Sequence, residues 1–166
     1  MTAPDTIEQV PTLSLAKLSS DDIADAIGSS FREYGFAMVV DHGIDVDLIA
    51  RGWALAKAFF ALPDAAKRAY LVPGGGGQRG YTAFGTEIAK GASENDLKEF
   101  WHVGRELPQG DPLAADMAPN VWPSEVNGFH ETFAALYDAF DATGWRILSG
   151  VARHLGRPAD WFGSRI

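Results

Sequence analysis

The chain has 166 residues, which is enough for one domain with a hydrophobic core but short for two. Its formal net charge of −8, from 14 basic and 22 acidic residues, argues against nucleic acid or an anionic membrane surface as a partner. The absence of cysteine excludes disulfides, thiolate metal sites and cysteine nucleophiles, and it fits a cytoplasmic location.

The N-terminal segment is mildly acidic and lacks a basic stretch followed by an apolar one, so we expect no signal peptide. No apolar run approaches the roughly 18 residues that a membrane-spanning helix needs. We expect residues 1–8 to be flexible and residues 9–166 to form one structured region.

The first elements are predicted from apolar spacing and from capping residues. Residues 10–15 predict a short edge strand, where Pro11 is tolerated although it lacks an N–H group. A helix is expected over residues 21–34, with a serine as its N-cap and Gly35 at its end. The continuous apolar run 36–40 then predicts a strand that is covered on both faces.

A second helix is expected to begin after Asp45 and to end at Pro63, with residues 64–68 adding one more helical turn. The side chains expected on its buried side are Leu48, Ile49, Trp53, Ala56, Phe59 and Phe60. Residues 72–91 are rich in glycine and predict an irregular stretch.

Residues 100–103 predict another strand, and residues 107–123, with four prolines, predict a loop. A long amphipathic helix is expected from residue 129 to 155. The order of elements predicts an α/β layer arrangement dominated by helix. Because few strands are available to cover these apolar helices, we expect a partner sheet to be missing, through truncation, a split gene or dimerisation.

His42 follows Asp41 at the end of the apolar strand, and its functional interpretation is a metal ligand or general base oriented by the aspartate. Adjacent residues on a strand point to opposite faces, however. We therefore favour a turn histidine whose ring hydrogen-bonds loop backbone and caps the following helix.

The other histidines also have a functional and a structural interpretation. On a helix, Glu99 and His102 would share one face, as the corresponding residues do in di-iron bundles. On a strand, their side chains point to opposite faces. We therefore favour charged residues that flank a strand. His130 and His154 lie off the apolar stripe of the long helix, and we expect them to be solvated. No histidine spacing predicts a complete metal site.

The run Gly74–Gly77 lacks the lysine and hydroxyl residue that end a phosphate-binding loop. Arg79 and Tyr81 follow it directly. A loop that carries such side chains is either a substrate lid or a flexible connection, and the sequence leaves both open.

Several weak motifs occur together in one order. They are the strand Pro11–Leu15, YGFAMVVDHGI (34–44), AFFALPDAAK (58–67), RGYTAFG (79–85), DLKEF (96–100), Trp122-Pro123 and a long helix ending in Leu-Gly. In this order the chain resembles the N-terminal region of the isopenicillin N synthase-like family of iron(II)- and 2-oxoglutarate-dependent oxygenases, over residues 9–163. Asp41 stands where that family usually has asparagine.

The resemblance implies the N-terminal helical layer and first strands of a double-stranded β-helix, or jelly roll. In the family a His-x-Asp pair and a distant histidine hold iron, and an Arg-x-Ser pair holds 2-oxoglutarate, all after the long helix. None of these motifs occurs in this chain. We therefore expect the catalytic jelly-roll half to lie outside it, with no catalytic or metal-binding residue inside it.

The implied function is oxidation of a small organic substrate with Fe(II) and 2-oxoglutarate, to which this chain alone would contribute neither activity nor a tight cofactor site. The resemblance makes Arg79, Tyr81, Phe84 and Glu87 candidates for substrate contact. It assigns structural roles to His42, Gly43, Pro63, Asp96 and Glu99. The alternative is a non-catalytic domain that binds a partner or self-associates through its apolar helix faces.

Overall fold

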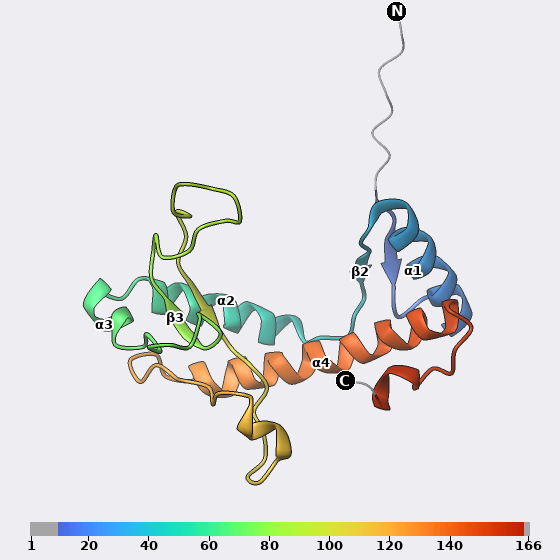
Figure 1. The fold of residues 1–166 in the computed structure, drawn as a ribbon. Coiled ribbons are helices and arrows are strands. Elements are labelled where there is room, and N and C mark those ends of the chain that lie inside the picture. The colour runs from blue at the N-terminus through green and yellow to red at the C-terminus, as the bar shows by residue number, and fades with distance from the viewer. Residues whose placement is uncertain (1–9, 165–166) are drawn as a thin grey trace, which may run out of the picture. The chain divides into compact units, whose positions relative to one another are not determined.

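The computed structural model describes residues 10–164 (Figure 1), so residues 1–8, which were expected to be flexible, lie outside the described residues. The chain divides into two compact units. The first unit runs up to Ile44 and resumes at Phe140, and the second unit is Asp45–Ala139. Helix α4 (Phe129–His154) contributes residues to both units.

The first unit contains a parallel two-stranded sheet in which β1 (Thr12–Ser14) pairs with β2 (Met38–Val40). Helix α1 (Ser20–Tyr34) connects the two strands, as a parallel pair requires a crossover. The Ser19 side chain caps the start of α1, and Gly35, with φ of +79°, ends it. These predicted elements and caps are confirmed.

Helix α1 packs closely on the C-terminal part of α4 because glycine occupies the contact on both helices. A Cβ on Gly150 would lie 3.1 Å from Ile23 Cγ2 and 3.4 Å from the fully buried Ile27. A Cβ on Gly28 would overlap the imidazole of His154. The helix contact therefore tolerates no side chain at Gly28 and little at Gly150.

The prediction that residues 36–40 are covered on both faces is wrong. The strand exists, but Phe36, Met38 and Val40 expose 52%, 49% and 40% of their surface. Among residues 10–164, β2 has β1 as its only strand neighbour. A strand is buried on both faces only when layers pack on both sides of its sheet.

The second unit is built around the antiparallel pair β3 (Gly80–Thr82) and β4 (Phe100–His102), in which Tyr81 lies opposite Trp101. Strand β4 was predicted, whereas β3 lies inside residues 72–91, which were predicted to be irregular. Three residues that begin with glycine are too short to show the alternation that predicts a strand.

Helix α2 (Val46–Phe60) starts as predicted after Asp45, whose carboxylate accepts a hydrogen bond from the Asp47 N–H at 2.8 Å. The short helix α3 (Asp64–Arg68) follows Pro63.

The buried side of α2 was only partly predicted. Phe59 is fully buried, but Trp53 is 67% exposed and was wrongly placed in the core. Its neighbour Gly52 faces α4, where a Cβ would come within 2.5 Å of Leu136 Cδ1. Since consecutive helix residues are rotated by about 100°, the residue after Gly52 points away from that contact.

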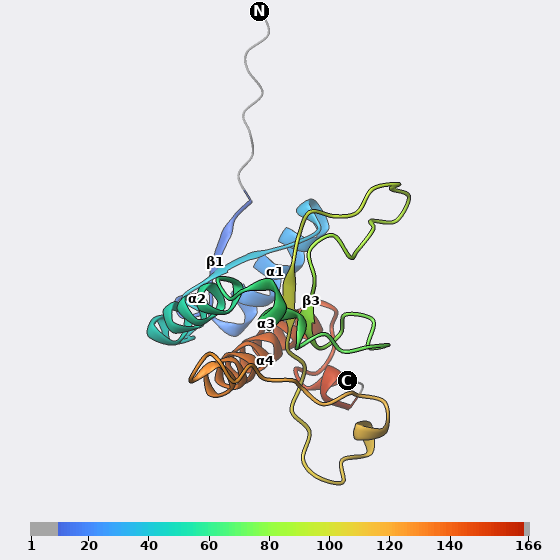
Figure 2. The same cartoon turned by 90° about the vertical axis from the view of Figure 1, so that its left-hand side faces the viewer.

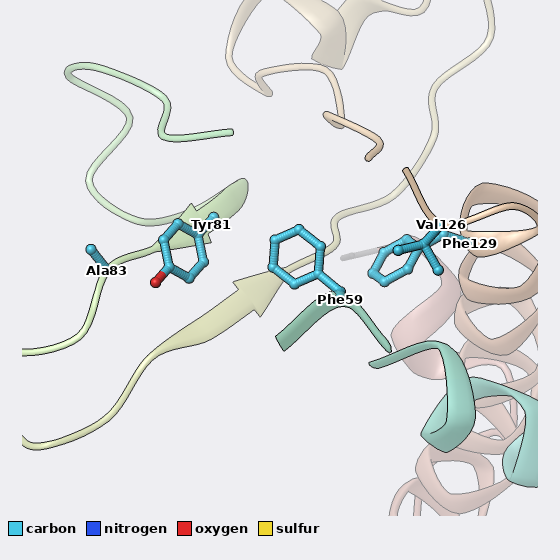
Figure 3. Packing of buried hydrophobic residues seen from close by; sticks show 5 residues of the cluster. All are labelled: Phe59, Tyr81, Ala83, Val126 and Phe129. Atoms are coloured by element: carbon cyan, nitrogen blue, oxygen red, sulfur yellow. The ribbon is translucent and has the colours of Figure 1, made fainter. Parts of the chain in front are cut away.

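Phe59 is the centre of the core of the second unit. Figure 3 shows its ring between Tyr81 on one side and Phe129 with Val126 on the other. Its ring makes edge contacts with Trp101 at 4.6 Å and with Tyr81 at 5.8 Å between centroids, the geometry that aromatic pairs favour. This cluster holds α2, the β3–β4 pair and the start of α4 together.

Two long connections complete the second unit. The connection from β3 to β4 extends away from the strands in both views (Figures 1 and 2), and the Asp96 N–H closes it on the Glu87 carbonyl at 2.7 Å. In the connection after β4, the Asn120 side chain accepts from the Gly104 N–H at 2.8 Å and donates to the Gly104 carbonyl at 2.7 Å. This second connection includes a 3-10 helix, η1 (Pro112–Ala115).

A second 3-10 helix, η2 (Trp161–Ser164), follows α4. Among the helices of residues 10–164, none has an apolar stretch long enough to cross a lipid bilayer.

Candidate functional site

Three polar side chains from separate elements form a hydrogen-bonded network beside the aromatic core. The Lys67 ammonium of α3 donates to both carboxylate oxygens of Glu99, at 2.7 and 3.0 Å. The Tyr81 hydroxyl of β3 donates to the nearer of these oxygens, Oε2. Lys67 and Tyr81 are only 8% and 2% exposed, so the network is largely shielded from water.

The environment keeps the Tyr81 phenol neutral and Glu99 ionised. Burial raises the pKa of Tyr81 to about 12, and the hydrogen bond to Glu99 and the charge of Glu99 act in the same direction. Burial also favours the neutral form of Glu99. The hydrogen bonds from Lys67 and Tyr81 and the Lys67 charge outweigh that effect and hold the pKa of Glu99 below its usual value.

A cavity of about 270 Å³ lies beside β3 and the glycine run that precedes it. Three of the four predicted substrate contacts, Arg79, Tyr81 and Glu87, line this cavity. Phe84 does not line it and is 55% exposed on the connection that extends from β3. The structure therefore brings most of the candidate residues to one place.

The polar groups of these candidates already have protein partners. The Arg79 guanidinium donates to the carbonyls of Ala118 at 3.0 Å and Gln78 at 2.7 Å. Glu87 pairs with Lys98 at 2.9 Å. Since the Tyr81 hydroxyl points to Glu99, the predicted substrate contacts retain hydrogen-bonding capacity for a ligand only in the remaining guanidinium N–H groups of Arg79 and one oxygen of Glu87.

Thr82 also lines the cavity; it belongs to the motif 79–85 but was not among the predicted substrate contacts. It is 6% exposed, and its hydroxyl makes no hydrogen bond within residues 10–164. A Cβ on Gly77 would lie 3.0 Å from this hydroxyl, so the glycine run covers it closely. The burial of Thr82 was not predicted because the strand β3 itself was not predicted.

His42 lies in the turn between β2 and α2. Its Nδ1 accepts a hydrogen bond from the Ile44 N–H at 3.0 Å, and Gly43 has φ of +85°. Asp41 instead accepts from the Ser14 hydroxyl at 2.5 Å. The two adjacent side chains thus have separate partners and do not form one Asp–His site.

Of the other residues with expected structural roles, Pro63 precedes α3, Asp96 pairs with Lys98 at 3.0 Å, and Glu99 belongs to the buried network. His102 contacts the Gly77 carbonyl through its Nδ1.

The prediction that the histidines of α4 are solvated holds for His130, which is exposed, and is wrong for His154. His154 is half-buried and its Nε2 lies 3.0 Å from Arg32 Nη2. His130 stacks on Trp122 with centroids 4.5 Å apart, and its Nε2 lies 2.9 Å from Glu106 Oε1. These partners are remote in sequence, so spacing along α4 could not predict them.

Among residues 10–164, no group of three or more histidine, aspartate and glutamate side chains is arranged to hold a metal ion. The sequence also lacks a His-x-Asp and an Arg-x-Ser motif. The residues present do not fit an iron or a 2-oxoglutarate site, so no chemical step is assigned to either group here.

Comparison with known proteins identifies the family. Residues 10–125 match the family model described as non-haem dioxygenase in morphine synthesis N-terminal. A 2-oxoglutarate-dependent dioxygenase of Penicillium crustosum is 35% identical over 132 residues, which cover 76% of this chain and 40% of that protein.

Solved structures give the same result. A crystal structure from Caulobacter crescentus, assigned to the 2OG-Fe(II) oxygenase family, matches with a TM-score of 0.84 at 41% identity, covering 93% of this chain and 51% of that chain. A full-length Neurospora crassa protein, crystallised in complex with alpha-KG, matches with a TM-score of 0.78 at 26% identity, covering 95% and 50% of the two chains.

This chain spans about half the length of the relatives that it matches. The matched residues 10–125 contain β1 to β4 with the network of Lys67, Tyr81 and Glu99. The family itself depends on Fe(II) and 2-oxoglutarate. The chain therefore belongs to the N-terminal family of non-haem, Fe(II)- and 2-oxoglutarate-dependent dioxygenases.

Proposed function

We propose that this chain is the N-terminal part of an oxidoreductase that uses Fe(II), O2 and 2-oxoglutarate to oxidise a small organic substrate. The match of residues 10–125 to the dioxygenase N-terminal model carries this proposal, supported by the TM-score of 0.84 to an oxygenase-family structure. The complete reaction would convert 2-oxoglutarate to succinate while the substrate is hydroxylated, desaturated or cyclised.

In this proposal the ligands of iron and 2-oxoglutarate belong to a jelly-roll half outside these 166 residues. This chain contributes the helical layer and the cavity beside β3. By itself it is inactive and binds neither group tightly.

The proposed substrate contacts are Arg79, Tyr81, Phe84 and Glu87. Two of the five guanidinium N–H groups of Arg79 are engaged by carbonyls, which fixes the group and leaves donors for a substrate carboxylate. The exposed ring of Phe84 offers apolar contact. Tyr81 contributes through its position in the cavity wall, since its hydroxyl is bonded to Glu99.

The first test is the reading frame after Ile166, which should encode a His-x-Asp motif, a later histidine and an Arg-x-Ser motif. The longer polypeptide should form succinate from 2-oxoglutarate only with Fe(II) and O2. Tight stoichiometric binding of Fe(II) by the 166-residue chain, measured by calorimetric titration, would contradict the proposed division of labour.

The second test concerns the substrate site of the longer polypeptide. Arg79→Ala should raise KM for a carboxylate-bearing substrate, whereas Arg51→Ala, at an exposed position of α2, should not. Equal KM values for Arg79→Ala and the unaltered enzyme would contradict the proposed contact between Arg79 and the substrate.

Exposed apolar side chains favour a second candidate, a non-catalytic domain that self-associates. Val46 and Trp53 of α2 are 73% and 67% exposed, and Leu97 is 82% exposed. Light scattering should then give a mass above that of one chain, and a monomer at all concentrations would rule this out. Under either candidate the partners we propose are small molecules or a second copy in the cytoplasm, not nucleic acid or membrane.

A further inference from the structure

The first unit contains a cavity of about 330 Å³ that none of the residues discussed above as substrate contacts reaches. Its apolar wall comes from the segment after β1 and from the first turns of α1. Its polar lining consists of two arginines and one serine from α4, Arg146, Arg153 and Ser149, and of Ser20 at the start of α1.

Arg146 is held in a fixed orientation with its charge uncompensated. Its Nη2 donates to the Leu15 carbonyl and its Nη1 to the His42 carbonyl, both at 3.0 Å. Within residues 10–164 no carboxylate forms an ion pair with this guanidinium, although the chain has 22 acidic residues. A guanidinium fixed by neutral carbonyls keeps its full positive charge for a further partner.

The second guanidinium is also available. Arg153 Nη1 lies 3.8 Å from Asp21 Oδ1, and the two side chains are 44% and 91% exposed. An ion pair this long and this exposed contributes little. The carboxylate of Asp21 can therefore give way to an anion that enters the cavity.

Two further features favour negative charge at the same place. The hydroxyls of Ser20 and Ser149 make no hydrogen bond with any residue that the structure describes, so both can donate to a ligand. The cavity also borders the first turn of α1, a 15-residue helix whose dipole favours negative charge at its N-terminal end, where an anion would share it with the carboxylates of Asp21 and Asp22.

We propose that this cavity binds a small oxyanion, a carboxylate or a phosphate group carried by an organic molecule. The oxygens are bound by Arg146 and Arg153, with Ser20 and Ser149 as further donors, and the organic part lies against Leu15 and Ile23. This site goes beyond the proposed oxygenase function and does not depend on it, because every group it uses lies in the first unit of this chain.

The test is a titration of the isotope-labelled 166-residue chain, followed by amide resonances in NMR. The probes are potassium butanoate and potassium phosphate, with potassium chloride at equal ionic strength as the reference. Either probe should shift the amides of Ser20, Ile23 and Gly150 in a saturable manner. The probe that saturates at the lower concentration identifies the oxyanion as carboxylate or phosphate.

Variants separate a built site from general electrostatic attraction. Arg153→Gln should weaken binding by about tenfold, the loss expected for one charge-assisted hydrogen bond. Arg157→Gln removes the same charge at a position over the Trp161 ring, 6.0 Å from its centroid, and should leave binding unchanged. Ser149→Ala should weaken binding a few-fold.

Two results would overturn the proposal. One is that neither probe shifts these amides more than chloride does. The other is that Arg157→Gln weakens binding as much as Arg153→Gln, since the arginine pair would then act only through the net charge of the protein.

Discussion

The Tyr81 hydroxyl donates its hydrogen bond to the same oxygen of Glu99 that the Lys67 ammonium contacts at 2.7 Å. One carboxylate thus receives a neutral and a charged donor from two different elements. Because the three residues lie on α3, on β3 and directly before β4, this single acceptor connects three short elements of five, three and three residues. It also makes the stability of the second unit sensitive to pH in both directions.

Tyr81→Phe removes one donor and leaves the ring in the core. We expect the free energy of unfolding to fall by about 1.5–3 kcal/mol, the usual range for a hydrogen bond to a charged group. Urea unfolding followed by circular dichroism measures this change. Tyr137→Phe is the matched control, because the half-buried Tyr137 has no hydrogen-bond partner that the structure describes, and its effect should stay within about 0.5 kcal/mol.

The raised pKa of Tyr81 predicts a loss of stability at high pH. The unfolded phenol loses its proton near its ordinary pKa of 10.0, whereas the folded one holds it to about 12. The stabilising contribution is therefore complete below pH 10 and disappears as the pH rises toward 12. Unfolding midpoints measured across this range should fall less steeply for Tyr81→Phe, and identical slopes would refute the assignment.

Lys67→Met leaves Glu99 without its cation. We expect a loss of about 3 kcal/mol, the lower end for a broken buried ion pair, because the Glu99 side chain keeps 24% of its surface exposed. The lowered pKa of Glu99 stabilises the fold above pH 4.5 and ceases to do so as the pH falls below that value. The free energy of unfolding should therefore decrease below pH 4.5 in the native chain, and it should decrease less steeply in Lys67→Met. Lys57→Met, at an exposed position of α2, serves as the control.

Arg146→Gln removes two hydrogen bonds that tie α4 to the carbonyls of Leu15 and His42. We expect a loss of about 1–3 kcal/mol. Hydrogen exchange should accelerate at the amides of β1 and β2 while those of β3 and β4 keep their protection. Equal acceleration in both sheets would show that the two units unfold together and that the effect is not local.

Gly28→Ala places a methyl group where the His154 imidazole lies. We expect destabilisation by about 1–3 kcal/mol from overpacking, with partial rescue by adding His154→Ala. Gly144→Ala is the contrasting change, since a Cβ there meets nothing within 4 Å. It should stabilise α4 by about 0.5–1 kcal/mol through helix propensity. Thermal unfolding midpoints of these variants, compared with that of the native chain, test both expectations.

Local signals in the sequence predicted much of the fold. Capping residues such as Ser19 and Asp45 and the terminating Gly35 are read from a few neighbouring residues. The start and end of α1 and the start of α2 were therefore predicted, whereas α2 ends at Phe60, before the expected stop at Pro63. The exposure of Trp53 depends on where α4 contacts α2, and that contact is set by Gly52 opposite Leu136. No local pattern encodes such a choice.

The candidate site was less predictable than the fold. The sequence analysis assigned Arg79, Tyr81 and Glu87 to one loop, and the structure puts them around one cavity. The partners that occupy their polar groups, Glu99 and the Ala118 carbonyl among them, are 18 and 39 residues away in sequence. Hydrogen bonds over such separations follow from packing and have no signature in the spacing of residues.

The pairing of the Asn120 side chain with both backbone groups of Gly104 has a practical consequence for engineering. The two ends of the intervening segment, residues 105–119, are held together by these two hydrogen bonds. The part of this segment around η1 is suited to a protease-cleavable tag or a grafted peptide, because a chain break there leaves the Gly104–Asn120 junction and the contacts of Glu106 and Ala118 intact. The two hydrogen bonds of Asn120 thus hold together the ends of a segment into which foreign sequence can be inserted.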